Sequence, residues 1–196
     1  MRRIVETLAI VAVALGLALA IQAFLVKPFR IPSESMVPTL EVGQRVLVDR
    51  FTQKLGSDLE RGDVLVFTPP AGADTNTCGA RDVPRRPCPE PTPGRSDTNF
   101  IKRVVGVGGD RLSVRDGRVY LNGRRQREPF ANVSACTDGG DCDLPVAITI
   151  PEDHLYMMGD NRGASADSRV WGPVPEEWVI GQAFATYWPP DRIGTL

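Results

Sequence analysis

The first pattern along the chain is a long apolar run near its N-terminus. Residues 7–26 contain no charged side chain, and 20 residues at helical rise span about 30 Å, the hydrocarbon thickness of a bilayer. The pattern therefore predicts a membrane-spanning helix over residues 7–26. A cleaved secretory leader is the alternative, because Ala18-Leu19-Ala20 is typical of a cleavage site. However, the apolar run continues to Val26, which is too long for the core of such a leader.

Short runs rich in branched and aromatic residues dominate the chain after residue 40. They occupy residues 44–51, 63–67, 100–107, 110–114, 118–122, 147–151, 154–160 and 179–188. Asp116-Gly117 and Asn122-Gly123 are dipeptides that favour two-residue hairpin turns. No segment there shows a long helical period. We therefore expect a mostly β, antiparallel and barrel-like domain over residues 27–196.

Two turn-rich segments interrupt these runs, at about residues 69–98 and 128–146. Each carries two cysteines, which form the close pairs Cys78/Cys88 and Cys136/Cys142. Short sequence loops are the easiest to close, so we predict one disulfide within each pair and surface loops around them. Zinc is the rival ligand, but neither pair has C-x-x-C spacing and His154 is the only histidine. We expect no metal at these cysteines.

Charge and cysteine usage bear on partners and topology. The net charge of −1 and the pI near 5.9 give no electrostatic case for nucleic-acid binding. Two positive side chains on each side of the apolar run nearly balance, so charge does not orient it. Disulfides favour an oxidising compartment. We therefore expect residues 1–6 in the cytoplasm and residues 27–196 outside it.

Two serines stand between two prolines in the segment IPSESMVPTL, residues 31–40. Pro32 and Pro38 restrict the backbone around Ser33 and Ser35, which predicts an extended stretch that aims a side chain. The alternative is a loop in which the serines only cap or turn the chain. An extracytoplasmic β domain with an activated serine would be a hydrolase, and such a serine needs a base.

The sequence offers two candidates for that base, Lys102 and His154. A lone histidine beside a strand is more often a scaffold residue than a catalyst. Strand alternation places Lys102 on the same face as Phe100 and Val104. Arg103, on the other face, better fits a solvated strand cation. Burial would lower the pKa of Lys102 towards neutrality, and a neutral lysine can take the proton from a serine hydroxyl.

A third polar segment, MGDNRGASADSRVWGPVP, covers residues 158–175 and follows a predicted strand. A calcium loop fails here, because positions 160, 162 and 164 read Asp, Arg and Ala. The segment is therefore a candidate part of the active site, and a purely structural turn is the alternative.

Taken in order, these segments resemble type I signal peptidases over nearly the whole chain. The matching stretches are the apolar run, PSESMVPTL, RGDVLVF, FIKRVVGVGGD and GDNRGASADSRVWG. The resemblance implies a mostly antiparallel β domain with a large hydrophobic surface against the membrane. It also implies a cofactor-free serine endopeptidase that removes N-terminal signal peptides from translocated preproteins.

The resemblance assigns roles to particular residues. Ser35 matches the nucleophile and Lys102 the general base. Ser33 matches the hydroxyl that joins the Ser35 backbone N–H in the oxyanion hole, and Ser165 matches the hydroxyl that orients the lysine. The supporting residues implied are Asp160, Asn161, Asp167 and Arg169. The implied pocket walls, which would select small residues at positions −1 and −3, are Phe29, Ile31, Met36, Leu40, Phe100 and Ile101.

The resemblance also implies a location, a single-pass protein of the bacterial cytoplasmic membrane whose partners are preproteins and the lipid bilayer. Glu34 stands where relatives often carry a small residue, and alternation is expected to point its side chain away from the site. The insertion at residues 69–98 has no motif that the resemblance places.

Two other functions compete with this interpretation. Self-cleaving Ser-Lys proteases of the SOS-repressor kind carry a DNA-binding domain in place of the apolar run. An anchored peptide-binding module is of a different class, but it has no use for both Ser35 and Lys102. Cleavage of a preprotein, compared between wild type and Ser35→Ala, separates these functions.

Overall fold

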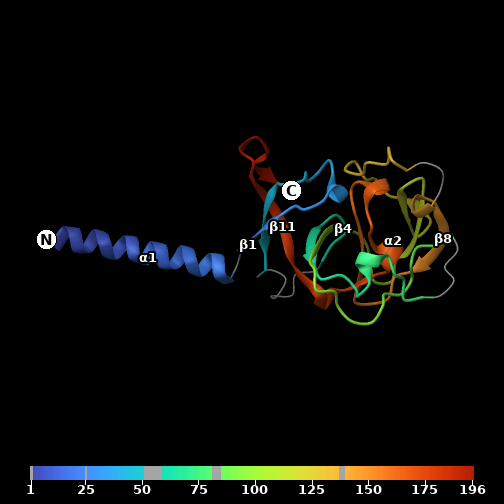
Figure 1. The fold of residues 1–196 in the computed structure, drawn as a ribbon, viewed down its shortest axis with the longest axis horizontal. Helices are drawn as coiled ribbons and strands as arrows, with labels where there is room; N and C mark the ends of the chain where they lie inside the picture. Colours follow the sequence, from blue (N-terminus) through green and yellow to red (C-terminus); the bar gives the residue numbers. More distant parts are fainter. Residues whose placement is uncertain (1, 25, 51–58, 81–84, 137–139) are drawn as a thin grey trace.

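The structure, a computed structural model, describes residues 2–24, 26–50, 59–80, 85–136 and 140–196, with the backbone alone for residues 2 and 17–24. The N-terminal run forms helix α1 (Arg2–Phe24), which extends away from the strands in Figure 1. The predicted span, residues 7–26, includes residue 25 and the side chains of residues 17–24, which lie outside the described residues. Over the described part of the chain, no helix is both long enough and apolar enough to cross a membrane.

Two antiparallel sheets make up the rest of the described chain, as the alternating runs predict. The larger sheet has the order β1 (Val26–Arg30), β2 (Arg45–Asp49), β11 (Val179–Trp188), β3 (Val64–Phe67), β4 (Phe100–Val107), β9 (His154–Met158) and β10 (Val174–Pro175), with β12 (Gly194–Thr195) on β11. The smaller sheet has the order β7 (Arg124–Arg125), β6 (Arg118–Leu121), β5 (Arg111–Arg115) and β8 (Leu144–Thr149). The mostly β, antiparallel fold class is confirmed.

The two predicted hairpin turns are confirmed by their backbone angles. Asp116 and Gly117 have φ of 49° and 72°, and Asn122 and Gly123 have φ of 52° and 81°. These left-handed pairs match the twist of the flanking strands, which is why short polar residues and glycine occupy them. Strand β1 is not among the predicted strands, because nothing in residues 26–30 besides their position after the apolar run indicates a strand.

Strand β4 lies inside the larger sheet, between β3 and β9. One of its ends packs against the smaller sheet, and the other carries the candidate site. At one end the smaller sheet covers Val105, Tyr156 and Met158 with a buried cluster that includes Leu112. A Cβ on Gly106 would lie 2.5 Å from Ile150 Cδ1, so this glycine permits the close approach. At the other end of β4 lies the candidate site.

The serine-bearing segment differs from its prediction. Ser33 is extended, with φ −139° and ψ 164°, but residues Glu34–Met36 form a 3₁₀ turn, η1. The Val37 N–H donates to the Glu34 carbonyl at 3.1 Å, which closes this turn. Ser35 therefore lies on a tight turn after a short extended stretch. Glu34 is exposed, but its direction is set by this turn and not by the alternation of an extended strand.

Both predicted disulfides, Cys78–Cys88 and Cys136–Cys142, are present. The prediction that the insertions are plain surface loops is wrong for the first one. Cys88 is 1% exposed, and its N–H donates to the Arg169 carbonyl at 2.9 Å. Residues 81–84 and 137–139 of the two insertions lie outside the described residues. The second insertion also contributes the start of β8.

Candidate active site

Ser35 and Lys102 come together near the N-terminal end of β4, inside the larger sheet. Lys102 Nζ lies 2.5 Å from Ser35 Oγ, although the two residues are 67 positions apart. Ser35 is 6% exposed and Lys102 is 5% exposed. Ser33 Oγ lies 3.2 Å from Ser35 Oγ, so η1 presents two hydroxyls and β4 presents one amine at the same point. A hydroxyl and an amine this close, both shielded from water, can exchange a proton.

The surroundings of Lys102 favour its neutral form. Burial lowers the pKa of Lys102 from its ordinary 10.5 to about 8, and the charge of Asp167 opposes part of that effect. About one tenth of the amine is therefore unprotonated at pH 7, far more than at the ordinary pKa. Only this neutral form has a lone pair that accepts a proton.

The segment after β9 holds the serine turn in place through its backbone. The Asn161 N–H donates to the Ser35 carbonyl at 3.0 Å, and Asn161 Nδ2 donates to the Glu34 carbonyl at 3.2 Å. Asn161 is 9% exposed, so these hydrogen bonds are shielded from water. The predicted supporting residue Asn161 thus fixes η1 directly.

Gly159 makes the approach between this segment and the serines possible. A Cβ at Gly159 would overlap the Ser35 carbonyl oxygen and Ser165 Oγ, and would lie 2.6 Å from Ser165 Cβ. Any side chain at this position would force the strand end and the serine turn apart. The Ser165 hydroxyl itself is buried and has no hydrogen-bond partner among the described residues. A buried hydroxyl without a partner is costly, and such groups concentrate at functional sites.

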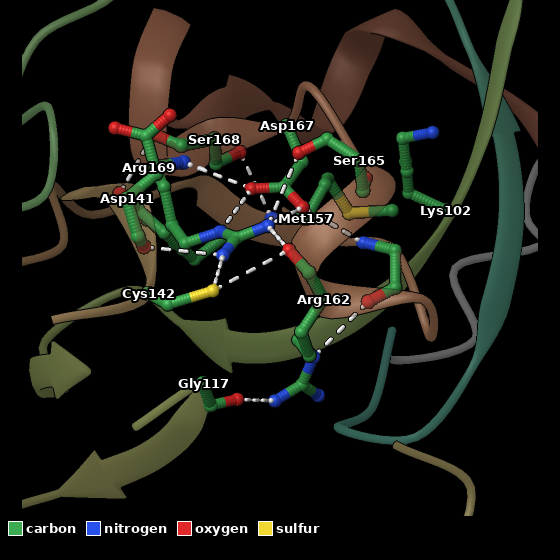
Figure 2. A network of polar contacts seen from close by, with 12 residues as sticks. Lys102, Gly117, Asp141, Cys142, Met157, Arg162, Ser165, Asp167, Ser168 and Arg169 are labelled. Carbon is green, nitrogen blue, oxygen red and sulfur yellow. Dashed lines mark hydrogen bonds and ion pairs between the residues drawn. The ribbon is translucent and has the colours of Figure 1, made fainter. Parts of the chain in front are cut away.

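Asp167 and Arg169 form a buried ion pair behind Ser165, at the centre of the network in Figure 2. Arg169 Nε donates to Asp167 Oδ1 at 2.7 Å, and both side chains are fully buried. Burial alone would raise the pKa of Asp167, but the charge and hydrogen bonds of Arg169 hold that pKa below its ordinary value. The other carboxylate oxygen, Oδ2, accepts from Arg169 Nη2 at 2.8 Å and from the Gly159 N–H at 3.0 Å.

The guanidinium of Arg169 also ties the surrounding loops together. It donates to the carbonyls of Ser165 at 3.1 Å and Arg162 at 2.7 Å, as Figure 2 shows for Arg162. It further donates to the Asp141 carbonyl at 3.1 Å, beside the disulfide of Cys142. Together these bonds fix the loop that carries Ser165.

A second buried pair joins the two sheets, and the sequence interpretation did not identify it. Arg162 Nη2 lies 2.6 Å from Glu128 Oε1, while Arg162 Nη1 donates to the Gly117 carbonyl at 2.7 Å. Arg162 Nε donates to the Gly159 carbonyl at 3.0 Å (Figure 2). Arg162 therefore connects the hairpin turn of the smaller sheet to the strand end beside Ser35. Glu128 lies 34 positions away, so no local pattern indicates this pair.

The prediction that Arg103 is a solvated cation is wrong. Arg103 is 8% exposed, and its Nη2 lies 2.7 Å from the carboxylate of Asp160, which also accepts from Thr39 Oγ1. The Arg103 guanidinium lies 4.0 Å from the ring centroid of Phe130. Alternation places Arg103 opposite Lys102, but loops cover that face too. Asp160, a predicted supporting residue, thus braces β4 one residue from the lysine.

An apolar groove of about 590 Å³ leads away from the two reactive groups. One wall is formed by residues 29–33 with Ser35, and the other by residues 98–102. Four further residues complete the lining, namely Val66, Asp74, Ala164 and Ala166. An extended peptide can lie between two such walls and pair with their backbones.

The groove contains only part of the predicted pocket. Phe29, Ile31, Phe100 and Ile101 line it, whereas Met36 and Leu40 are fully buried in the core beneath and are not among its lining residues. His154, the alternative base, does not line it either. Its ring Nδ1 lies 2.7 Å from the Glu152 carbonyl, at the opposite end of β9 from Gly159. Ala164 and Ala166 were missed, because nothing in a turn-rich segment shows which residues face a groove.

Comparison with known proteins identifies relatives. The family described as signal peptidase, peptidase S26, matches residues 4–188. A probable signal peptidase I-2 of Synechocystis is 33% identical over 93% of this chain and 72% of that protein. A signal peptidase I of Leptolyngbya laminosa is 32% identical over 98% of this chain and 84% of that protein. A signal peptidase IB of Staphylococcus aureus is 31% identical, covering 96% of this chain and 91% of that protein.

A solved signal peptidase I from Enterococcus faecalis aligns with 22% identity and a TM-score of 0.43, over 64% of this chain and 97% of that one. The match over residues 4–188 includes every strand of both sheets except β12, and every residue of the site. The chain therefore belongs to the type I signal peptidases of peptidase family S26.

Proposed function

We propose that this protein is a membrane-attached serine endopeptidase that removes signal peptides from translocated preproteins by a Ser-Lys pair. The observation that carries the proposal is the distance of 2.5 Å between Lys102 Nζ and Ser35 Oγ inside a buried site. Membership of the signal peptidase family supports the substrate class. The apolar groove beside the pair supports an extended peptide as the ligand.

The proposed reaction begins with the neutral amine of Lys102. It accepts the hydroxyl proton of Ser35 while Ser35 Oγ attacks the carbonyl carbon of the scissile bond. The C–N bond then breaks, the Lys102 ammonium gives its proton to the leaving amine, and the N-terminal part of the substrate remains as an ester on Ser35. Water, deprotonated by Lys102, hydrolyses this ester and restores the serine.

Negative charge develops on the substrate oxygen during each attack. We assign its stabilisation to the Ser33 hydroxyl and the Ser35 backbone N–H. Ser33 Oγ lies 3.2 Å from Ser35 Oγ, which is close enough for its hydroxyl to reach an oxygen bonded to the attacked carbon. A prearranged donor in a site shielded from water contributes more than the same donor in solvent.

Ser165 is proposed to orient the lysine amine, since its hydroxyl is buried near the site without another partner. Asp167 and Arg169 hold the backbone of Ser165 and leave its hydroxyl unengaged. Their role is positioning, because both side chains are buried behind the loop and neither lines the groove.

The proposed specificity is for small neutral residues at positions −1 and −3. Phe29, Ile31, Phe100 and Ile101 supply apolar surface on both groove walls, which disfavours charged side chains by desolvation. Close walls exclude large side chains by overlap.

Attachment to the membrane is proposed through residues 7–26, which carry no charge. The described apolar side chains of α1 are exposed, for example Ile10 at 69%. Three exposed apolar residues of the β domain, Phe184, Trp188 and Ile193, provide further surface for lipid contact. Residues 1–6 would then lie in the cytoplasm and residues 27–196 outside it, where the disulfides form.

The test is cleavage of a purified preprotein by the full chain in detergent or vesicles. Wild type should release the mature protein, and Ser35→Ala should not. Ser134→Ala is the matched control, because Ser134 is exposed and outside the groove. Binding of the preprotein without cleavage by wild type would favour a peptide-binding module and overturn the proposal.

A further inference from the structure

The first insertion, residues 69–98, contributes two residues to the lining of the groove. Asp74 and Thr98 both belong to it, and Thr98 leads directly into β4. Figure 1 shows the insertion as the green segment beside β4 and α2 (Ser168–Trp171). The insertion is therefore part of the substrate-facing surface as well as a disulfide-closed loop.

Asp74 is held in place by its neighbours. It lies in the short helix η3 (Ala73–Thr75), and Ala73 is 1% exposed in a cluster with Phe67, Phe100 and Trp171. The Ala71 N–H donates to the Gly94 carbonyl at 3.1 Å, which closes the base of the insertion. The position of the Asp74 backbone is thus fixed by the core.

Asp74 is the only carboxylate among the described residues that line the groove. Its side chain is exposed, and it makes no hydrogen bond or ion pair within the described part of the chain. The cations that line the groove are Arg30 in the 29–33 wall and Lys102 at the reactive end. An exposed carboxylate without a partner beside a peptide groove can attract a cationic side chain of the peptide.

Asp74 directly follows Ala73, which packs in the cluster that includes Phe100, and both Asp74 and Phe100 line the groove. Phe100 precedes Lys102 by two residues, about 7 Å along a strand. Phe100 and Ile101 also line the proposed pockets for positions −1 and −3. In the proposed binding mode, the substrate residues that precede position −3 continue past these pockets towards Asp74.

We propose that Asp74 is a specificity determinant that favours a cationic side chain, and disfavours an anionic one, in the substrate segment just before position −3. The proposal rests on the proposed function, because it concerns the same groove. A single exposed ion pair changes a rate constant only modestly. We expect Lys to be preferred over Glu by about three- to tenfold in kcat/KM at the responsive position.

The experiment uses the full chain and peptides with Ala at −1 and −3. Each peptide carries one Lys, Gln or Glu at one position from −4 to −7. Wild type should show the Lys preference at one or two adjacent positions, and Asp74→Asn should reduce the ratio to near one. Asp74→Lys should invert it. Asp97→Asn is the control, since Asp97 is an exposed carboxylate of the same insertion that does not line the groove.

The outcomes separate the two proposals. If wild type cleaves no peptide, the proposed function fails. If wild type cleaves the Gln peptides but does not distinguish Lys from Glu, or Asp74→Asn keeps the preference, the role of Asp74 is overturned. Loss of the preference in Asp97→Asn would assign it to overall charge and likewise overturn the role. Equal cleavage of the Gln peptides by all variants shows that the variants are folded.

Discussion

At the scale of single residues, the site depends on a lysine that the fold keeps partly neutral. Lys102 lies on a central strand among apolar groups, and this burial dominates the lowering of its pKa. The ion pair of Asp167 and Arg169 lies close by but is nearly neutral overall, so neither charge alone controls Lys102. Exclusion of water is therefore what suits this strand lysine to the proposed role of base.

The pH dependence of cleavage should follow this titration. A pKa of about 8 for Lys102 means that the neutral base is scarce at pH 6 and predominant at pH 9. We expect kcat/KM to rise about tenfold per pH unit below pH 7 and to level off above pH 9. A pH–rate profile on one peptide checks this. The His154→Ala variant should keep the same acidic limb, and a limb that disappears in that variant would contradict the assignment of Lys102.

The buried hydroxyl of Ser165 gives a second prediction at this scale. Ser165→Ala removes the hydroxyl proposed to orient the amine but leaves Ser35 and Lys102 in place. We expect kcat to fall about ten- to hundredfold with little change in KM, because misplacing a base affects the chemical step. Steady-state kinetics measure this. A purely structural role would instead lower the melting temperature while leaving kcat of the folded enzyme unchanged.

At the scale of elements, the site is assembled where the end of β9 meets the serine turn η1. Gly159 lies between them. Two residues later, the Asn161 N–H donates to the Ser35 carbonyl. The exact placement of Ser35 therefore depends on a position without a side chain.

Gly159→Ala should accordingly cost at least a hundredfold in kcat/KM, because its Cβ would overlap Ser165 Oγ and the Ser35 carbonyl oxygen. The matched control is Gly194→Ala in β12, where an added Cβ meets nothing within 4 Å. Kinetics of the two folded variants provide the comparison. Near-wild-type activity of Gly159→Ala would mean that the serine turn tolerates displacement.

Most of the strands were predictable, although β1 was not. Alternation and the neighbours of Lys102 made it a candidate base beside His154, and the resemblance to signal peptidases implied its pairing with Ser35. The burial of Arg103 and its ion pair with Asp160 were not predictable, because Asp160 lies on a loop whose path depends on tertiary contacts. The resemblance implied pocket roles for Met36 and Leu40, but both side chains pack in the core, Met36 from the end of η1. The insertion gave no signal of its contact with Arg169, since a hydrogen bond from the Cys88 backbone leaves no trace in residue types.

At the scale of the whole molecule, Arg169 contacts the backbone next to both disulfides. The Cys88 N–H bonds its carbonyl, and its guanidinium donates to the Asp141 carbonyl next to Cys142. Figure 2 shows Asp141 and Cys142 against this guanidinium. The loops that the disulfides close therefore support the residue that positions Ser165.

Removal of the first disulfide should have two effects. The double variant Cys78→Ala and Cys88→Ala should lose about 2–4 kcal/mol of unfolding free energy, as expected for a loop of this kind. Some cleavage should remain, because neither cysteine lines the groove. Denaturant unfolding and peptide cleavage measure the two effects. Unchanged stability would show that the insertion does not brace the domain.

The central claim, that Lys102 is the base for Ser35, is tested most directly by cleavage of one precursor peptide by Lys102→Arg. Arginine keeps the positive charge but stays protonated at any working pH, so it has no lone pair to accept the serine proton. The control is Lys27→Arg, since Lys27 is exposed and does not line the groove. We expect folded Lys102→Arg to be as inactive as Ser35→Ala, with Lys27→Arg near wild type. Cleavage by Lys102→Arg at a rate near wild type would contradict the account.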